Sequence, residues 1–255
     1  MATGKHDQTL FELSLRMGDN ALILGQRISA WCGHAPVLEE DIALANVALD
    51  LIGQASLWLG FAGEIEGEGR TADNLAFLRA DREFRNCLLV EQPNGDFGHT
   101  LMRQFLFDAW HLPMLKALTL SSDERVAAIA AKSAKEATYH LERSEDFVIR
   151  LGDGSDESHR RMQDALDVLW PFAGELTCAD EIDVALADKG LGPDLGAIGA
   201  EYKEYMERML KKATLTADWQ APIRKGGKVG DHSEALGHLL PEMQWLQRSH
   251  PGAVW

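Results

Sequence analysis

The chain has 255 residues with 45% apolar content, seven Trp and nine Phe. This composition excludes an intrinsically disordered protein and suffices for one large domain with a buried core. The formal net charge of −15 disfavours binding to nucleic acid, because phosphates attract clustered Lys and Arg. No stretch approaches the ~18 unbroken apolar residues that cross a bilayer, and the first residues carry no targeting pattern. We therefore expect a cytoplasmic protein that binds neither nucleic acid nor membrane.

Apolar residues recur about every 3.6 positions along most of the chain, and this periodicity predicts an all-α fold. The first predicted helix covers about residues 7–31 and has no acid on its apolar arc, since Glu12 and Asp19 fall on the opposite side. The second runs from just after Pro36 to about Ile65, and its two apolar seams predict burial on most sides. One seam holds Leu38, Ile42, Ala45, Leu49 and Ile52, and the other holds Leu44, Ala48, Leu51, Ala55, Trp58 and Ala62.

The rest of the chain continues the helical pattern. Further helices are predicted at about 73–84, 98–118, 123–151, 157–177, 194–213 and 233–248. The helix at 98–118 is apolar all round and should be the most buried, whereas the next one has a single apolar face. Four long helices in this order predict a helical bundle, for which the ferritin-like four-helix arrangement is one option. We predict one domain, residues 1–255, with a core bundle at about 7–151 and additional C-terminal helices at about 156–255.

A dinuclear metal site in such a bundle takes a Glu from each of two helices and a Glu-x-x-His pair from each of the others. None of the nine histidines has Glu three residues before it. Asp108 and His111 form an Asp-x-x-His pair in mid-helix, while Asp96 and Asp156 fall at helix starts, where Asp is a common capping residue. We interpret Asp108, His111 and Gln104 as a buried polar network, with metal ligation as the open alternative.

The other helices offer few ligands for a metal. His140 lies on the apolar face of its helix, but Ala137 stands where the carboxylate would be needed. Glu136 lies beside it and pairs with Lys135 either near the bundle axis or at the surface. The inward polar residues of the second helix include a Gln, which is a poor substitute for an imidazole ligand. We therefore predict no catalytic, cofactor-binding or metal-binding residue, only a polar remnant of a site: Asp50, Gln54, Asp108, His111, Glu136 and His140.

A basic loop and the free thiols are the remaining candidate features. Arg224, Lys225 and Lys228 lie in a Gly-rich segment that we interpret as a solvated loop, with an acidic partner or a ligand phosphate as the alternatives. The three cysteines are far apart in the sequence and odd in number, which favours reduced thiols over a disulfide framework: Cys32, Cys87 and Cys178.

Several long segments closely resemble the non-catalytic ferritin-like subunit of the phenylacetyl-CoA epoxidase complex. They are GHAPVLEEDIALANVALDLIGQA (33–55), LLVEQPNGDFGHT (88–100), FDAWH (107–111), KEATYHLERSEDFVIRLGDGSDES (135–158) and EMQWLQRSHPGAVW (242–255). The resemblance covers almost the whole chain. The catalytic subunit of that family has a stretch similar to DELGHG. Aligned with DLIGQA here, it places Leu51 at the position of its Glu and Gln54 at the position of its His.

The resemblance implies a structural subunit that packs against a di-iron catalytic subunit in a hetero-oligomer. That complex converts phenylacetyl-CoA to its 1,2-epoxide with molecular oxygen and electrons from NADPH. The implied partners also include a small accessory subunit and a reductase that carries flavin and iron–sulfur groups, while this chain itself holds no cofactor. Two other hypotheses remain: a di-metal oxygenase with atypical ligands, and a helical scaffold or acyl-CoA-binding module outside any oxygenase.

Overall fold

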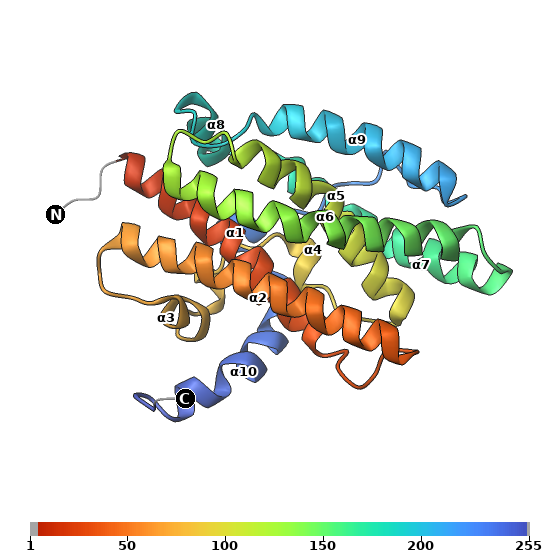
Figure 1. Ribbon diagram of the computed structural model, residues 1–255, viewed down its shortest axis with the longest axis horizontal. Coiled ribbons are helices and arrows are strands. Elements are labelled where there is room, and N and C mark those ends of the chain that lie inside the picture. The colour runs from red at the N-terminus through yellow and green to blue at the C-terminus, as the bar shows by residue number, and fades with distance from the viewer. Residues whose placement is uncertain (1–4, 254–255) are drawn as a thin grey trace. The chain divides into compact units, whose positions relative to one another are not determined.

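The computed structural model describes residues 5–253, with side chains from residue 8 onward. Over this range the regular structure consists of α-helices and short 3-10 helices, without a strand (Figure 1). The prediction of an all-α fold is therefore confirmed.

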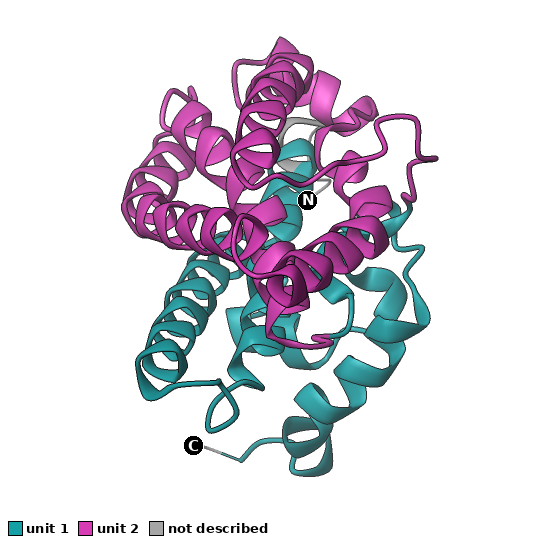
Figure 2. Ribbon diagram, turned by 90° about the vertical axis from the view of Figure 1, so that its right-hand side faces the viewer, with its two compact units in different colours: residues 1–93, 226–255 teal, residues 94–225 magenta. Residues whose placement is uncertain are grey.

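The chain divides into two compact units, which Figure 2 colours separately. The first unit contains residues 1–93 and 226–255, and the second unit contains residues 94–225. The boundary after residue 93 lies inside the predicted core bundle, and the last segment of the chain packs with the N-terminal one. That the whole chain acts as one domain stays a prediction.

The first unit is built on a pair of long helices, α1 (Lys5–Ser29) and α2 (Leu38–Glu66), which lie side by side (Figure 1). The short loop between them makes the pair antiparallel. The prediction that α2 has two buried seams is confirmed for one of them. The buried seam consists of Leu44, Ala48, Leu51, Ala55, Trp58 and Ala62. The helix ends at Gly67, whose φ of 71° is the left-handed conformation that favours glycine at a helix C-terminus.

The prediction that α2 is covered on most sides is wrong. In its other seam Leu38 is 70% exposed, Leu49 is 65% exposed and Ile52 is 40% exposed. The reason is that α2 packs against α1 and α3 (Ala72–Phe77) along one side of its surface. The periodicity predicts that both seams are apolar, but it does not predict whether residues of the same chain or of another protein cover them.

The remaining parts of the first unit are short segments that pack around this helix pair. The predicted helix at 73–84 is interrupted. The helix α3 ends at Phe77, and the 3-10 helix η1 (Asp81–Glu83) follows, with the Glu83 side chain accepting a hydrogen bond from the Ala80 amide. The short helix α4 (Leu88–Glu91) follows. The C-terminal segment contributes η3 (Gly227–Val229) and α10 (Glu234–Ser249), which packs against α3, η1 and α4. A Cβ atom on Gly227 would lie 2.1 Å from the Asn86 carbonyl oxygen, so this close approach requires glycine.

The second unit centres on α5 (Phe97–Leu118), which contacts α6 (Glu124–Gly152), α7 (Asp156–Ala173) and α9 (Leu195–Lys212). Almost every α5 side chain is buried, as predicted. Asp96 caps α5 by accepting a hydrogen bond from the His99 amide, which confirms its predicted place at a helix start. The 3-10 helix η2 (Gly174–Thr177) and the short helix α8 (Glu181–Asp188) were not predicted, although the Asp180–Asp183 capping box marks where α8 begins.

Candidate functional site

Polar side chains gather in the interior of the second unit, on the facing sides of α5 and α6. Gln104, Asp108 and His111 come from α5, while His140 and Ser144 come from α6. None of the five is more than 1% exposed. Their three- and four-residue spacings place them on one face of each helix. The structure therefore confirms that Asp108, His111 and His140 are buried.

Asp108 is fixed by two hydrogen bonds. Gln104 Nε2 donates to Asp108 Oδ1 at 2.6 Å, and Ser144 Oγ donates to Asp108 Oδ2 at 2.9 Å. Burial raises the pKa of Asp108 from 3.8 to about 8, although both hydrogen bonds act in the opposite direction. At pH 7 this carboxyl is therefore largely protonated and neutral.

His111 is also held neutral. Burial, with a further contribution from nearby His140, lowers the pKa of His111 from 6.5 to about 3. Its ring lies against aromatic neighbours, with centroid distances of 4.8 Å to Phe107 and 6.1 Å to Trp110. The imidazole therefore behaves as part of the packed core.

Several polar atoms of this interior have no hydrogen-bond partner in the described part of the chain. They are Gln104 Oε1, His111 Nδ1 and Ser133 Oγ. Buried groups of this kind usually bond to ordered water. A neutral carboxyl, the neutral imidazole of His111, an amide and hydroxyls suit such neutral partners.

The other predicted remnant residues are not part of this cluster. Glu136 is half-buried on α6 beside the buried Ala137. Gln54 is 1% exposed and Asp50 is half-buried, and both lie on α2 in the first unit. Within one unit the structure thus brings together Asp108, His111 and His140.

The residues of this cluster do not fit a dinuclear metal centre. Two metal ions carry at least four positive charges, which bridging carboxylates must balance. The cluster offers a single carboxyl, Asp108, whose two oxygens already accept hydrogen bonds and whose burial favours the neutral form. Among residues 8–253 no group of three or more His, Cys, Asp or Glu side chains is placed to hold a metal ion. We therefore derive no metal chemistry from these residues.

The Asp108→Asn variant should become more stable relative to the wild type as pH rises. Between about pH 4 and 8 the folded Asp108 keeps a proton that the unfolded chain releases, so wild-type stability falls with pH. The lowered pKa of His111 has the opposite effect and makes stability rise with pH, but only below pH 6.5. From pH 6.5 to 8 the gap should widen by about 2 kcal/mol in favour of the Asn variant. Urea unfolding at both pH values measures this difference, and an equal gap at the two would contradict it.

A tyrosine at the edge of this interior was not found from the sequence. Tyr205 on α9 donates a hydrogen bond to Glu145 on α6, and burial together with this carboxylate raises the pKa of Tyr205. A small cavity of about 140 Å³ lies beside it, lined by Ala109, Leu112, Pro113, Lys116, Leu141, Glu201 and Tyr205. No spacing or motif in the sequence marks this tyrosine.

The first unit contains a buried ion pair between Asp19 and Arg79, although Asp19 was predicted to lie on the polar side of its helix. Asp19 is fully buried and is bound by both terminal nitrogens of the Arg79 guanidinium, with Arg79 Nη1 at 3.0 Å from Asp19 Oδ2. The Arg85 amide donates to the same carboxylate at 2.8 Å. Asp19 was expected on the polar side of its helix. That side is covered too, since every residue from Leu13 to Ile23 on α1 is buried.

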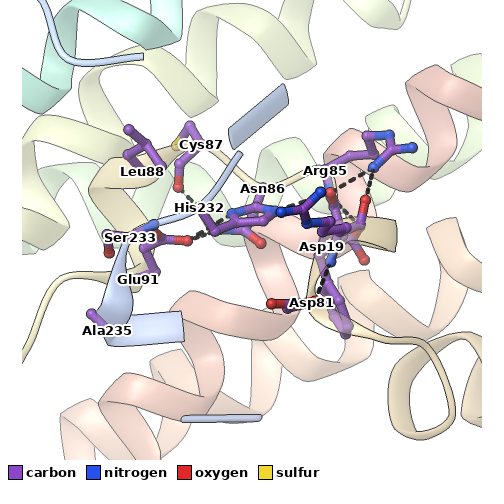
Figure 3. A network of polar contacts seen from close by, with 12 residues as sticks. Asp19, Asp81, Arg85, Asn86, Cys87, Leu88, Glu91, His232, Ser233 and Ala235 are labelled. Atoms are coloured by element: carbon purple, nitrogen blue, oxygen red, sulfur yellow. Dashed lines mark hydrogen bonds and ion pairs between the residues drawn. The ribbon is translucent and has the colours of Figure 1, made fainter. Parts of the chain in front are cut away.

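A second carboxylate of the first unit binds the returning C-terminal segment (Figure 3). Glu91 Oε2 lies 2.9 Å from His232 Nδ1, and Glu91 Oε1 accepts from the Ser233 amide at 2.7 Å. Asn86 Nδ2 donates to Glu91 at 3.0 Å. Arg27 of α1 donates to the carbonyl oxygens of Glu91 and Ala235 at 2.6 and 3.1 Å. This network connects α1, α4 and the segment that leads into α10.

His232 is favoured in its protonated form. Burial lowers its pKa, but the hydrogen bond and charge of Glu91, with the Phe84 carbonyl, outweigh burial and raise the pKa above 6.5. Protonated His232 can donate from Nδ1 to Glu91 and from Nε2 to Phe84, where the distance is 3.1 Å. Sequence reasoning missed this pair, although Glu91 lies inside one of the resembling segments.

The basic loop is largely exposed to solvent, and the cysteines form no disulfide. Arg224 is exposed, with its guanidinium 5.2 Å from the centroid of the Phe172 ring. Lys225 is exposed, with Nζ at 3.9 Å from Cys178 Sγ, while Lys228 is half-buried and belongs to the first unit. All three cysteines are free, as predicted.

Comparison with known proteins agrees with the resemblance. The family model described as phenylacetic acid catabolic protein matches residues 1–255. A curated relative, the C subunit of 1,2-phenylacetyl-CoA epoxidase from Escherichia coli (strain K12), is 49% identical over 242 residues, which cover 95% of this chain and 97% of the relative. The chain therefore belongs to the family of phenylacetic acid catabolic proteins.

Proposed function

We propose that this chain is the structural, non-catalytic subunit of a phenylacetyl-CoA 1,2-epoxidase and that it packs against and supports a di-iron catalytic subunit. The identity of 49% over nearly the full length of both chains supports membership of the same kind of complex. The observation that carries the non-catalytic role is the interior of the second unit. The single carboxyl of the cluster between α5 and α6, Asp108, is neutral and hydrogen-bonded where a metal pair would need several ionised carboxylates.

The proposed assembly is a cytoplasmic hetero-oligomer with a catalytic subunit, a small accessory subunit and a reductase. The oxygen chemistry and the di-iron centre belong to the catalytic subunit in this proposal, and the electrons come from NADPH through the reductase. The contribution of this chain is then the packed helical surface that it presents to its partners.

Co-expression with the other oxygenase subunits tests this proposal. We expect the chain to co-purify with a di-iron subunit, and we expect the chain alone, produced in iron-supplemented cells, to contain far less than one iron per molecule. Metal analysis and size-exclusion chromatography measure both. Two irons per isolated chain, with epoxidation when a reductase is added, would establish the alternative of a catalytic subunit with atypical ligands. Failure to co-purify would favour a scaffold outside any oxygenase.

The His140→Ala variant separates structure from ligation within the complex. His140 is 1% exposed beside His111, so its removal leaves a cavity and should cost about 1–3 kcal/mol of unfolding free energy. Iron per assembled complex should not change, because the residue binds no metal in this proposal. Urea unfolding of the chain and iron analysis of the complex measure the two effects. Loss of iron at unchanged assembly would contradict the structural role.

A further inference from the structure

The exposed seam of α2 is a concentrated apolar surface. We use the name α2 seam for Leu38, Ile42, Ala45, Leu49 and Ile52. Ile42 is 53% exposed and Leu49 is 65% exposed, and the other members are at least partly exposed. Their alternating +4 and +3 spacing is the pattern of a helix that packs lengthwise against another helix.

The apolar surface continues toward the C-terminal end of α2 with small residues. Gly53 and Ser56 are exposed and Gly60 is half-buried, all on the same side of the helix as the α2 seam. A Cβ atom on Gly53 or Gly60 would meet nothing within 4 Å. Small side chains let a second helix approach closely. Together with the α2 seam they form a surface about 33 Å long, at about 1.5 Å per residue.

The charges of α2 all have one sign. The helix contains no Lys, Arg or His, while Glu39, Glu40 and Asp41 lie in its first turn and Asp50 beside the α2 seam. Glu64 and Glu66 lie near its end. A helix that packs along this surface gains electrostatic stabilisation when it carries Lys or Arg beside its own apolar face.

The same charges argue against a second copy of this chain as the occupant. Two α2 helices packed in parallel would place their acidic first turns together. Packed antiparallel, they would place the first turn of each near Glu64 of the other, whereas Glu66 is already paired with Arg70. Both arrangements bring like charges together, which is destabilising at an interface.

A membrane is also a poor match. The helix α2 is long and apolar enough to span a bilayer by composition alone, but 44% of its most apolar window is buried inside the protein. Helices that lie on membranes carry Lys and Arg at the polar border, where they meet anionic headgroups. The border of the α2 seam is acidic instead.

We propose that the α2 seam is the docking surface for a helix of a different subunit of the oxygenase, a helix with an apolar face bordered by Lys or Arg. This inference rests on the proposed function, because it names the surface through which this chain would join its complex. The partner helix would cover the leucine and isoleucine side chains and would place its cations near Glu39 and Asp50.

The test uses the full chain and the co-expressed complex. Leu49→Asp places a charge at an exposed position in the middle of the α2 seam and should weaken association with the other subunits at least ~30-fold, as at the centre of an interface. Glu39→Lys should weaken it about 3–10-fold and reduce its dependence on salt. Leu120→Asp is the matched control, since Leu120 is 85% exposed in the second unit, and it should assemble as the wild type does. Binding is measured by size-exclusion chromatography and a surface-immobilised titration.

Folding and the alternative occupants are checked with the same variants. The circular dichroism spectrum and urea midpoint of Leu49→Asp should match those of the wild type. The proposal is overturned if Leu49→Asp assembles normally. It is also overturned if the wild type alone forms a dimer that this variant lacks, or if it binds phosphatidylcholine–phosphatidylglycerol vesicles and the variant does not.

The proposed function and this inference fail in different ways. A wild-type chain that associates with no other subunit would remove both. A wild-type chain that associates normally, with Leu49→Asp and Glu39→Lys equally competent, would leave the proposed function standing and remove only the surface assigned to it.

Discussion

The Asp19→Ala variant should lose about 3–5 kcal/mol of unfolding free energy, because it leaves the Arg79 guanidinium buried without its counter-charge. Arg79 is 2% exposed and Asp19 is fully buried, so the unpaired charge of Arg79 stays out of bulk water. The Arg85 amide loses its acceptor in the same variant. Urea unfolding monitored by circular dichroism measures the loss.

Two further variants identify the cause of this effect. Asp146→Ala removes the carboxylate of an exposed i, i+4 pair with Arg150 and should cost no more than about 0.5 kcal/mol. Adding Arg79→Met to Asp19→Ala removes the unpaired charge and should restore part of the lost stability. If Asp19→Ala and Asp146→Ala had equal effects, burial of the ion pair would not contribute to stability.

The helices of this chain could be predicted well because their signals are local. The apolar period locates α1, α2, α5 and α6, and Asp96 marks the start of α5 by capping it. The short helix α8 was missed because its few residues give too little periodicity, so that only its capping box identifies it. The predicted helix at 73–84 was too long, since α3 ends at Phe77 and the separate helix η1, capped by the Glu83 side chain, follows it.

Burial was predicted less well because it depends on contacts between segments that are distant in the sequence. Asp19 looks like a surface residue by helical period, yet Arg79 and Arg85, about 60 residues later, surround it. The α2 seam looks like a core face, yet the described residues leave it exposed. An apolar pattern alone does not distinguish a core from an interface.

In the candidate site, too, local patterns were predictable and contacts between distant segments were not. Asp108, His111 and His140 could be selected because each is a polar residue on an apolar helix face, and the structure places all three in one interior. Glu91 and His232 could not, because Glu91 ends the short helix α4 and His232 follows a Gly-rich loop, and neither segment is long enough to show a helical period. Their proximity depends on the C-terminal segment returning to α4.

Substitution of Glu91 should have the second large effect on stability. In Glu91→Ala, His232, Asn86 and the Ser233 amide all lose a buried acceptor, and the unfolding free energy should fall by about 3–5 kcal/mol. The contact of Arg27 with the Glu91 carbonyl oxygen involves the backbone and remains. Hydrogen exchange should therefore increase most in the segment that precedes α10, where His232 and Ser233 lie.

Glu91→Gln tests the charge of this residue separately from its hydrogen bonds. With its oxygen toward the Ser233 amide, the Gln side chain can donate to a neutral His232, but the Asn86 amide group loses its acceptor at every pH. The part of the difference that changes with pH therefore reports the pairing with the imidazolium. Because the folded pKa of His232 is raised, the advantage of the wild type is fully present below about pH 6.5 and is lost as pH rises through the folded pKa. The wild type should exceed Glu91→Gln by about 1–3 kcal/mol at pH 6 and by less at pH 9. A difference that stayed the same from pH 6 to pH 9 would mean that His232 is neutral in the folded protein.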